Sequence, residues 1–464
     1  MESALEVLNR RISDWQTRVA DVTPSTRLPD DQLKKRVAVY DFASAHDLQD
    51  LVADVADLLE AGTLHSTHPR YFGLFNPGVR SAGVIADALA ALYNPQLAAH
   101  WHAPAACEIE SQVLRYFLCR IGFDSTEASA TFTTGGAEAN LTGVLAALSD
   151  AFPHYSEGGL AGLERRPVLY ASDQVHDSFV KIARITGLGG EALRRLPADD
   201  QQRFKVMDLR RAIDHDRASG YSPFLVIGTV GTTATGAIDP LAELAALCGE
   251  EGLWLHADAA WGGLALLSDN LRKHVASLAL ADSITWDAHK VLPVPMGAGM
   301  FFCRSKSCAE SIFSVRPGYV PASSPGSTDA YQRTVQWSRR FIGLKVFMTI
   351  AEVGAAGVAA LVDHQAEMAD LLRDELTANG WRVTNDSPLP LVCFTRSDMP
   401  KNGTAAIADS VAAEGDAWIS EVRLPSGDSW LRACITHYQT DAADIHRLVV
   451  AVNRAFASLH LDSY

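Results

Sequence analysis

Lys290 is the first residue whose type and position indicate chemistry. It closes the short run SITW in the segment SITWDAHKVLP, and Pro293 and Pro295 stop a regular helix from continuing beyond it. A lysine at the end of a strand is commonly no more than solvated. Whether Lys290 has a chemical role therefore depends on the groups that other strands place near it.

A carboxylate, Asp258, ends another apolar run, in the segment LWLHADAAWGG. An unpaired carboxylate beside a buried strand is costly to desolvate, so a cationic partner is expected. A helix cap at the end of the strand is the simpler alternative for this residue taken alone.

A glycine turn joins a strand to a helix in the segment TFTTGGAEANLTGVLAAL. Gly135 and Gly136 let the backbone approach an anion closely, and the first amides of the helix, near Ala137, point at it. Such turns also occur without any ligand, and this one is neither a P-loop nor the GxGxxG fingerprint of dinucleotide sites.

Together these segments provide what a pyridoxal phosphate site requires, namely a lysine amine, an acid for the pyridine nitrogen and donors for the phosphate. An ion pair with Asp258 would raise the pKa of the ring nitrogen and keep the ring an electron sink. His176, in YASDQVHDSFVKIA, ends a further strand and is placed to stack on the ring. A capping or core-edge histidine is the alternative for His176.

The elements that must position these residues follow from the alternation of patterns along the chain. Between about His68 and Arg304, short β-rich runs alternate with helical stretches, which indicates a parallel sheet covered on both faces. Ligands of such sheets bind beyond the carboxyl ends of the strands. Helical patterns precede this region, and the aperiodic segment SVRPGYVPASSPGSTDAY is expected to be a functional loop.

The composition excludes several classes of protein. The chain has 464 residues, 48% of them hydrophobic, and a net charge of −15, which favours a soluble globular protein of two or three lobes over a nucleic-acid or anionic-membrane binder. The seven cysteines lack metal-site spacing and are expected to be reduced, and no metal is expected. We also expect no membrane-spanning stretch, no secretory signal at the start of the chain and a cytoplasmic location.

The order and spacing of several segments resemble the group II pyridoxal-phosphate amino-acid decarboxylases. The segments are HPRYFGLFNP, APAACEIE, TTGGAEANL, VHDSFVKIA, GTVGTTATGAIDPL, LWLHADAAWGG, DAHK and TVQWSRRF. This family includes the aromatic amino acid, glutamate, cysteine sulfinate and diaminobutyrate decarboxylases, and the resemblance extends over nearly the whole chain from about Leu64.

The resemblance implies an α/β protein of fold type I that works as a homodimer. It places an N-terminal helical segment that wraps the partner at residues 1–63 and a large domain with a mainly parallel seven-stranded sheet at 64–340. A mobile loop is expected at about 314–333 and a small C-terminal α/β domain at 341–464.

The resemblance also implies roles at matching positions. Lys290 would form the internal aldimine, His176 would stack on the ring and Ala260 would pack on its other face. The cofactor-binding residues would be Gly135, Gly136, Ala137, His176, Thr233, Asp258, Ala260, His289 and Lys290. Gly135 and Ala137 stand where relatives often carry serines, so backbone amides must do more, and Val291 replaces a frequent tryptophan.

The implied reaction is decarboxylation of an L-amino acid to its amine and carbon dioxide. Tyr331 is nearest to the tyrosine that in the family protonates the product carbanion, with a register offset of about one residue, and Tyr319 is the fallback. An exposed loop aromatic is the alternative for either residue.

Substrate contacts are expected from Phe75, Asn76 and Arg432, the last as a bidentate partner for a carboxylate. An arginine before an apolar strand is equally compatible with a structural role. Leu74 stands where aromatic-specific relatives carry a ring, which favours a small or acidic substrate. Another pyridoxal reaction (aldehyde-forming oxidative deamination, transamination or carbon–carbon or carbon–sulfur lysis) and a non-catalytic cofactor-binding homologue are the alternatives.

Overall fold

A computed structural model describes residues 3–25, 28–315, 318 and 329–461. The chain forms two compact units. The terminal unit contains Met1–Gly78, Glu367–Thr384 and Val392–Tyr464, and the central unit contains Val79–Ala366 and Asn385–Leu391.

The central unit is built on a seven-stranded sheet in the order β1-β7-β6-β5-β4-β2-β3. Strands β2 to β6 pair in parallel, whereas β7 is antiparallel to both β1 and β6. The strands are β1 (Ser129–Thr133), β2 (Pro167–Ser172), β3 (Leu193–Leu196), β4 (Ser222–Thr229), β5 (Trp254–Asp258), β6 (Ser283–Asp287) and β7 (Gly299–Cys303). The prediction of a large, mainly parallel seven-stranded sheet is confirmed.

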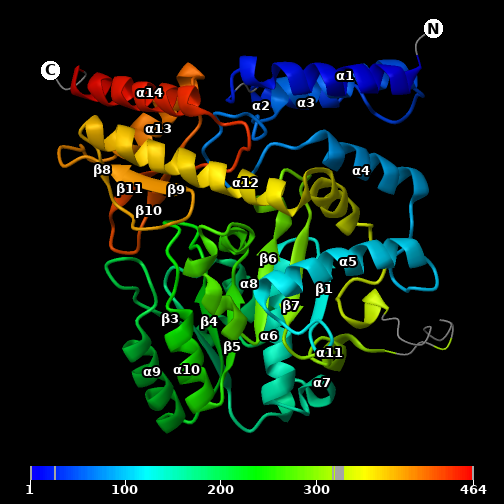
Figure 1. Cartoon of the computed structure of the whole chain (residues 1–464), viewed down its shortest axis with the longest axis vertical. Helices are drawn as coiled ribbons and strands as arrows, with labels where there is room; N and C mark the ends of the chain where they lie inside the picture. The colour runs from blue at the N-terminus through cyan, green and yellow to red at the C-terminus, as the bar shows by residue number, and fades with distance from the viewer. Residues whose placement is uncertain (1–2, 26–27, 316–317, 319–328, 462–464) are drawn as a thin grey trace. The chain divides into compact units, whose positions relative to one another are not determined.

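Helices flank this sheet, as the green and cyan ribbons of Figure 1 show. Helix α6 packs against strands β4 to β7, α9 and α10 pack against β4, and α5 packs against β1. The helices are α4 (Ser81–Tyr93), α5 (Pro104–Ile121), α6 (Gly136–Ala151), α7 (Tyr155–Gly158), α8 (Ser178–Ile185), α9 (Val206–Ala218), α10 (Leu241–Glu251) and α11 (Glu310–Phe313). Side chains of α6, α8, β2 and β4 share one apolar core, which packs both helices against the sheet.

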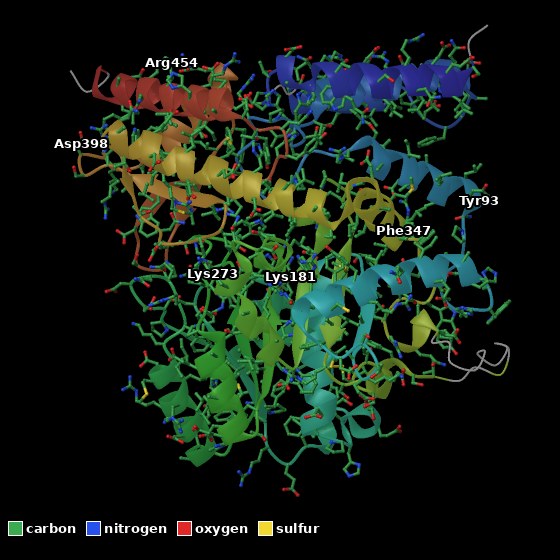
Figure 2. All side chains as sticks on the ribbon, in the orientation of Figure 1. Tyr93, Lys181, Lys273, Phe347, Asp398 and Arg454 are labelled. Carbon is green, nitrogen blue, oxygen red and sulfur yellow. A yellow bond between two sulfur atoms is a disulfide. The ribbon has the colours of Figure 1, made fainter. Side chains whose placement is uncertain are left out.

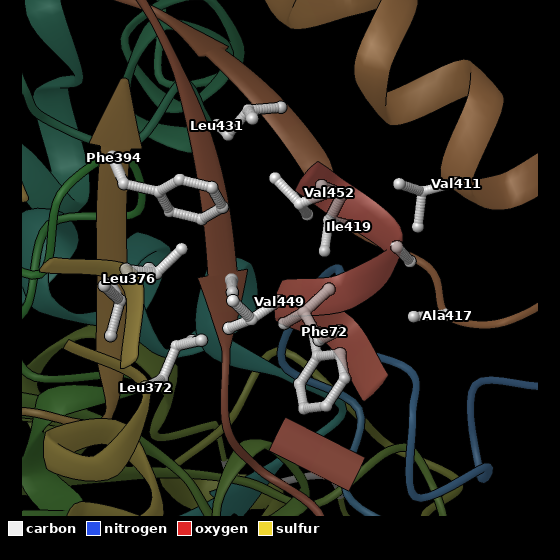
Figure 3. Packing of buried hydrophobic residues seen from close by; sticks show 14 of the residues in the cluster. Phe72, Leu372, Leu376, Phe394, Val411, Ala417, Ile419, Leu431, Val449 and Val452 are labelled. Carbon is white, nitrogen blue, oxygen red and sulfur yellow. The ribbon is translucent and has the colours of Figure 1, made fainter. Parts of the chain in front are cut away.

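The terminal unit combines helices from both ends of the chain with a four-stranded sheet in the order β10-β11-β9-β8. Its helices are α1 (Ala4–Arg18), α2 (Asp30–Val37), α3 (Leu48–Gly62), α13 (Gly403–Glu414) and α14 (Ala442–Leu461). Its strands are β8 (Arg382–Val383), β9 (Leu391–Thr395), β10 (Ser420–Arg423) and β11 (Ser429–Cys434). Figure 3 shows the core of this unit, in which Phe72 packs with residues such as Ile419, Val449 and Val452.

The boundaries of the two compact units differ from those of the predicted segments 1–63, 64–340 and 341–464. Phe72 explains part of the difference, because its amide donates to the Trp418 carbonyl (2.7 Å) and its carbonyl accepts from the Cys434 amide (2.8 Å). These bonds tie the segment before Gly78 to the terminal unit. The three-segment division stays a prediction.

Helix α12 (Gly343–Ala378) begins in the central unit and ends in the terminal unit. By length and composition it is apolar enough to cross a membrane, which the expectation of no spanning stretch overlooked. Two features weigh against that role: Gly354 interrupts the helix with non-helical dihedrals, and Lys345 is buried, with Nζ donating to the Met296 carbonyl at 2.9 Å. A core helix of a globular protein passes the same test of length and composition.

One expectation about the cysteines is wrong. Cys303, at the end of β7, and Cys308 are joined by a disulfide, because the turn after the strand brings the two side chains together. The other five cysteines carry free thiols, as expected.

Candidate active site

Lys290 and Asp287 form an ion pair at the end of β6. The strand ends at Asp287, and a single turn of 3-10 helix (Ala288–Lys290) brings Lys290 Nζ to 3.0 Å from Asp287 Oδ2. The Asp287 side chain is only 1% exposed, and its Oδ1 atom is buried without a hydrogen-bond partner among the described residues. The lysine that the sequence singled out is therefore held by a buried carboxylate whose role the sequence did not reveal.

The glycine turn lies directly against this pair. A Cβ atom at Gly136 would come within 2.7 Å of Asp287 Oδ2 and 3.3 Å of the Ala260 methyl group. A side chain at Gly136 would therefore have to displace Asp287, and no side chain among the described residues caps the first turn of α6. The free amides at the start of the helix, those of Gly136 and Ala137, form the anion-binding cradle that a phosphate needs.

His289 lies beside the same turn, with its Cε1 atom 3.7 Å from the position of a Cβ at Gly135. Its Nδ1 accepts a hydrogen bond from the Ala298 amide at 3.1 Å, so Nε2 carries the proton and can donate to an anion. Burial lowers the pKa of His289, and Asp287 only partly offsets this effect. A neutral imidazole that donates through Nε2 suits a phosphate ligand.

Glu138 fixes the turn from the other side. Its Oε2 accepts from the Thr134 amide (2.9 Å) and the Thr134 hydroxyl (2.7 Å), and Gln336 Nε2 donates to both carboxylate oxygens at 2.8 Å. The acidic group thus stays in the first turn of α6, where it also suits the helix dipole. These bonds connect the turn to the segment that follows the predicted loop.

Asp258 ends β5 and is 5% exposed. Its Oδ1 accepts from the Ala260 amide at 3.1 Å, and its Oδ2 accepts from Asn140 Nδ2 at 3.0 Å. Within the described part of the chain, no lysine, arginine or histidine forms an ion pair with it. A buried carboxylate supported only by neutral donors is suited to a protonated pyridine nitrogen, as the sequence predicted.

His176 and Thr233 both present exposed side chains at the carboxyl ends of strands. His176 Nδ1 accepts from the Ser178 amide at 3.2 Å, which orients the ring of this exposed residue. The Ser178 hydroxyl lies 3.4 Å from Asn140 Nδ2, so the His176 turn connects to Asp258 through Asn140. An exposed and oriented imidazole is compatible with stacking on a cofactor ring.

Tyr331 lies in the short 3-10 helix Ala330–Gln332 and is 6% exposed. Its amide donates to the Ala98 carbonyl at 3.0 Å, its hydroxyl accepts from Gln332 Nε2 at 3.0 Å, and its ring lies 4.9 Å from that of Trp337. The alternative of an exposed loop aromatic is wrong for Tyr331, whereas its catalytic role stays a prediction. Tyr319 lies outside the described residues.

The expected substrate residues Phe75, Asn76 and Arg432 belong to the terminal unit. Within that unit the Arg432 guanidinium stacks on the Phe75 ring at 5.0 Å, and Nη1 donates to the Gly73 carbonyl at 2.6 Å. The structure therefore joins two of these three residues, and their contact with a substrate stays a prediction.

Sequence reasoning missed Asp287 and Asn140. Both lie inside segments that carried the resemblance, DAHK and TTGGAEANL. A polar residue that is buried next to a functional one was the available signal, but the direction of its side chain depends on the packing of other elements.

Comparisons with known proteins agree with this geometry. The chain is 33% identical over 336 residues to the aromatic-L-amino-acid decarboxylase of Bacillus atrophaeus, and the aligned region covers 71% of this chain and 68% of that protein. It is 28% identical over 392 residues to the acidic amino acid decarboxylase GADL1 of Mus musculus, covering 83% and 68% of the two chains. The crystal structure of Oryza sativa TDC with PLP and tryptamine has the same fold, with a TM-score of 0.92 at 21% identity over 98% of this chain and 97% of that one.

The sequence of residues 32–397 matches the pyridoxal-dependent decarboxylase conserved domain. Lys290, the buried Asp258 and the amides of Gly136 and Ala137 are the groups that pyridoxal phosphate requires, so this cofactor fits the residues present. The chain therefore belongs to the pyridoxal-dependent decarboxylase family and is a pyridoxal-phosphate-dependent amino-acid decarboxylase.

Proposed function

We propose that this decarboxylase acts on an acidic or small L-amino acid and that Arg432 binds a carboxylate of the substrate. The surroundings of Arg432 carry the proposal. The guanidinium is 3% exposed, and its Nε and Nη2 atoms have no hydrogen-bond partner among the described residues. A buried cation with unused donors is costly unless an anion completes it.

Neutral groups surround Arg432 where the structure describes its neighbours. Nη1 donates to the Gly73 carbonyl and lies 3.3 Å from the Ser420 hydroxyl, and no carboxylate forms an ion pair with the guanidinium there. Burial raises the pKa of the neighbouring Cys434 thiol to about 11, an effect that Arg432 partly offsets. The planar fork thus keeps two donor positions suited to a bidentate carboxylate.

The similarity to the acidic amino acid decarboxylase GADL1 also supports an acidic substrate. Leu74, which is half exposed, offers no aromatic ring for stacking on a large substrate. Against this stands the similarity to an aromatic-L-amino-acid decarboxylase, so the choice of substrate needs a direct measurement.

The proposed chemistry follows from the residues of the central unit. Pyridoxal phosphate, when bound, supplies a ring that accepts the electrons released when the bond between the α-carbon and the carboxylate breaks. Lys290 would provide the amine that attaches the cofactor, and Asp287 Oδ2, 3.0 Å from Nζ, would orient that amine. Asp258 would pair with the protonated ring nitrogen and so keep the ring able to accept electrons.

The other residues orient these groups. The amides of Gly136 and Ala137, with His289, would hold the phosphate, and His176 and Ala260 would pack against the ring. Tyr331 remains the proposed donor of the proton that replaces the carboxylate on the α-carbon.

A panel of L-amino acids, read by carbon dioxide release and amine formation, tests the substrate proposal. We expect the highest kcat/KM with aspartate, glutamate or a small amino acid. Arg432→Lys should raise KM for that substrate by about tenfold, since one bidentate contact to a charged group is lost. Arg423→Lys, whose exposed side chain lies on β10, is the matched control and should change KM less than twofold. Highest activity on an aromatic amino acid, with KM unchanged in Arg432→Lys, would contradict the proposal.

We also propose that the enzyme is a homodimer. Leu92 and Tyr93, at the end of α4, are 74% and 77% exposed, and Figure 2 labels Tyr93 at that end of the helix. Tyr93 also lines a groove of about 590 Å³, together with residues that include Leu89, Ile109 and Phe341. Light scattering should give a molar mass near twice 50.0 kDa, and a mass near 50.0 kDa for the active enzyme would contradict the proposal.

A further inference from the structure

Asp258 is the last member of a chain of five hydrogen-bonded side chains in the central unit. Trp254 Nε1 donates to the Ser283 hydroxyl at 2.9 Å, and that hydroxyl lies 2.8 Å from His256 Nδ1. His256 Nε2 lies 3.0 Å from Asn140 Oδ1, and Asn140 Nδ2 donates to Asp258 Oδ2 at 3.0 Å. All members except the half-buried Trp254 are buried.

The hydrogen bonds between these five side chains all run in one donor-to-acceptor direction, which the orientation of the Asn140 amide determines. Its amide nitrogen must face Asp258, because an amide oxygen 3.0 Å from a carboxylate oxygen would be repelled. The amide oxygen then faces His256 Nε2, so that nitrogen carries the proton. The Thr285 hydroxyl, 3.3 Å from the same nitrogen, is a second and more distant partner.

His256 transmits this direction because it is neutral. Burial lowers its pKa to about 4, and Asp258 only partly offsets the effect. A neutral imidazole has one N–H group, which lies on Nε2, so Nδ1 accepts the proton of the Ser283 hydroxyl. Every donor in the chain therefore points toward Asp258.

The helix beside this chain is shaped to admit the histidine ring. A Cβ atom at Gly143 would lie 2.6 Å from His256 Cε1 and Nδ1, so only glycine leaves room there. Gly143 follows Asn140 by one turn of α6, and the Phe179 ring meets the His256 ring edge-on at 6.0 Å. The ring is 0% exposed, so bulk solvent does not reach its two nitrogens.

We propose that Asn140 is a positioning residue that donates to Asp258 and aims its carboxylate at the place of the cofactor ring nitrogen, with His256 and Ser283 acting through it. The physical basis is that a donor to a carboxylate stabilises its charged form. Without the Asn140 donor, the proton shared between the ring nitrogen and Asp258 moves toward the carboxylate. The inference concerns cofactor binding and does not depend on which amino acid is the substrate.

Equilibrium binding of the cofactor to the apo-protein gives the first test. Asn140→Ala should weaken binding of pyridoxal phosphate about tenfold, the expectation for one hydrogen bond to a charged group. The same variant should bind a deaza analogue, in which C–H replaces the ring nitrogen, within about twofold of the wild type, because Asp258 has no ion pair to make with it. Equal weakening for both ligands would show that Asn140 only shapes the pocket and would overturn the proposal.

The protonation state of the ring nitrogen gives the second test, through the ¹⁵N chemical shift of labelled pyridoxal phosphate in the holoenzyme. In Asn140→Ala the shift should move from the pyridinium value toward that of neutral pyridine. Ser283→Ala, at the far side of His256, should move it in the same direction by a smaller amount, and it keeps the test valid if Asn140→Ala does not fold.

Thr142→Ala is the matched control. Thr142 is equally buried on α6, but its hydroxyl donates to the Glu138 carbonyl and to none of the five hydrogen-bonded side chains that end at Asp258. This variant should keep the wild-type shift and cofactor affinity. A wild-type shift in both Asn140→Ala and Ser283→Ala would overturn the proposal.

Discussion

At the scale of single residues, the site depends on two buried carboxylates with different partners. Asp287 is paired with the Lys290 ammonium, whereas Asp258 is supported by the neutral donors of Ala260 and Asn140. A carboxylate that already has a cation cannot serve a second one equally well. This difference assigns Asp287 to the lysine and leaves Asp258 for the ring nitrogen.

Asp287→Asn tests the first assignment. The amide keeps the shape of the side chain but removes the charge that holds Nζ, so we expect kcat to fall by about tenfold to a hundredfold while the protein stays folded. Steady-state kinetics and a thermal melt measure the two effects. Asp269→Asn, whose side chain is 87% exposed, is the control and should match the wild type. An unchanged kcat in Asp287→Asn would refute the role of the pair.

Tyr331→Phe tests the proposed proton donor. The hydroxyl is the only group removed, and the ring contact with Trp337 is retained. We expect the yield of amine per carbon dioxide to fall at least about tenfold, within the range of a lost general acid. Quantifying amine, ammonia and carbon dioxide from one turnover mixture measures this ratio. An unchanged ratio would return Tyr331 to a packing role and direct attention to Tyr319.

At the scale of elements, the site is made where β1, β5 and β6 end and α6 begins. The strand ends supply Asp258, Asp287 and Lys290, and the tight turn before α6 lets the helix amides approach them. Gly136 is the position where this approach is closest, because a Cβ there has no space beside Asp287.

Gly136→Ala should therefore impair the cradle. The added methyl group must displace Asp287 Oδ2, at a cost of about 1–3 kcal/mol by the usual scale of overpacking, and the cofactor affinity should fall by at least about tenfold. Cofactor titration of the apo-protein measures the change. Gly249→Ala, in α10 with nothing within 4 Å of its Cβ, should leave the affinity unchanged. Wild-type affinity in Gly136→Ala would argue against a phosphate at this turn.

The sequence predicted the elements better than the contacts between them. The hydrophobic periodicity and the turn residues located the strands. They also placed Lys290, Asp258 and Gly136 at one edge of the sheet, because the carboxyl ends of parallel strands share an edge whatever the strand order. The pairing of Asp287 with Lys290 and the bonds of Asn140 depend on how β6 and α6 pack on β5, which no local pattern contains. For the same reason the burial of Tyr331 and the Cys303–Cys308 disulfide were not predicted.

At the scale of the whole molecule, buried histidines connect stability to pH. Burial lowers the pKa of His437 to about 4, with its bond to the Thr67 carbonyl as a partial offset. The unfolded chain binds the proton near pH 6.5, so between about pH 6.5 and 4 the unfolded state holds more protons than the native one. Stability is therefore lost as the pH falls through this window.

His437→Gln isolates this contribution, because other groups such as Asp239, with a pKa raised to about 7 by burial, shift stability in the opposite direction. Between pH 7.5 and 5.5 the free energy of unfolding should fall by about 1.3 kcal/mol more in the wild type than in the variant. This is the effect of one histidine that is protonated in the unfolded state but not in the native state. Urea denaturation at both pH values measures the difference. Parallel losses in the two proteins would contradict the burial of a neutral His437.

The central claim is that Lys290 carries the cofactor, and borohydride reduction of the holoenzyme tests it most directly. Reduction makes the link between the lysine and the cofactor permanent, so peptide mapping by mass spectrometry can locate it. We predict the pyridoxyl mass increment on Lys290 in the peptide that contains SITWDAHK, and no increment in Lys290→Ala. An increment on another lysine, or none on a protein saturated with pyridoxal phosphate, would contradict the account.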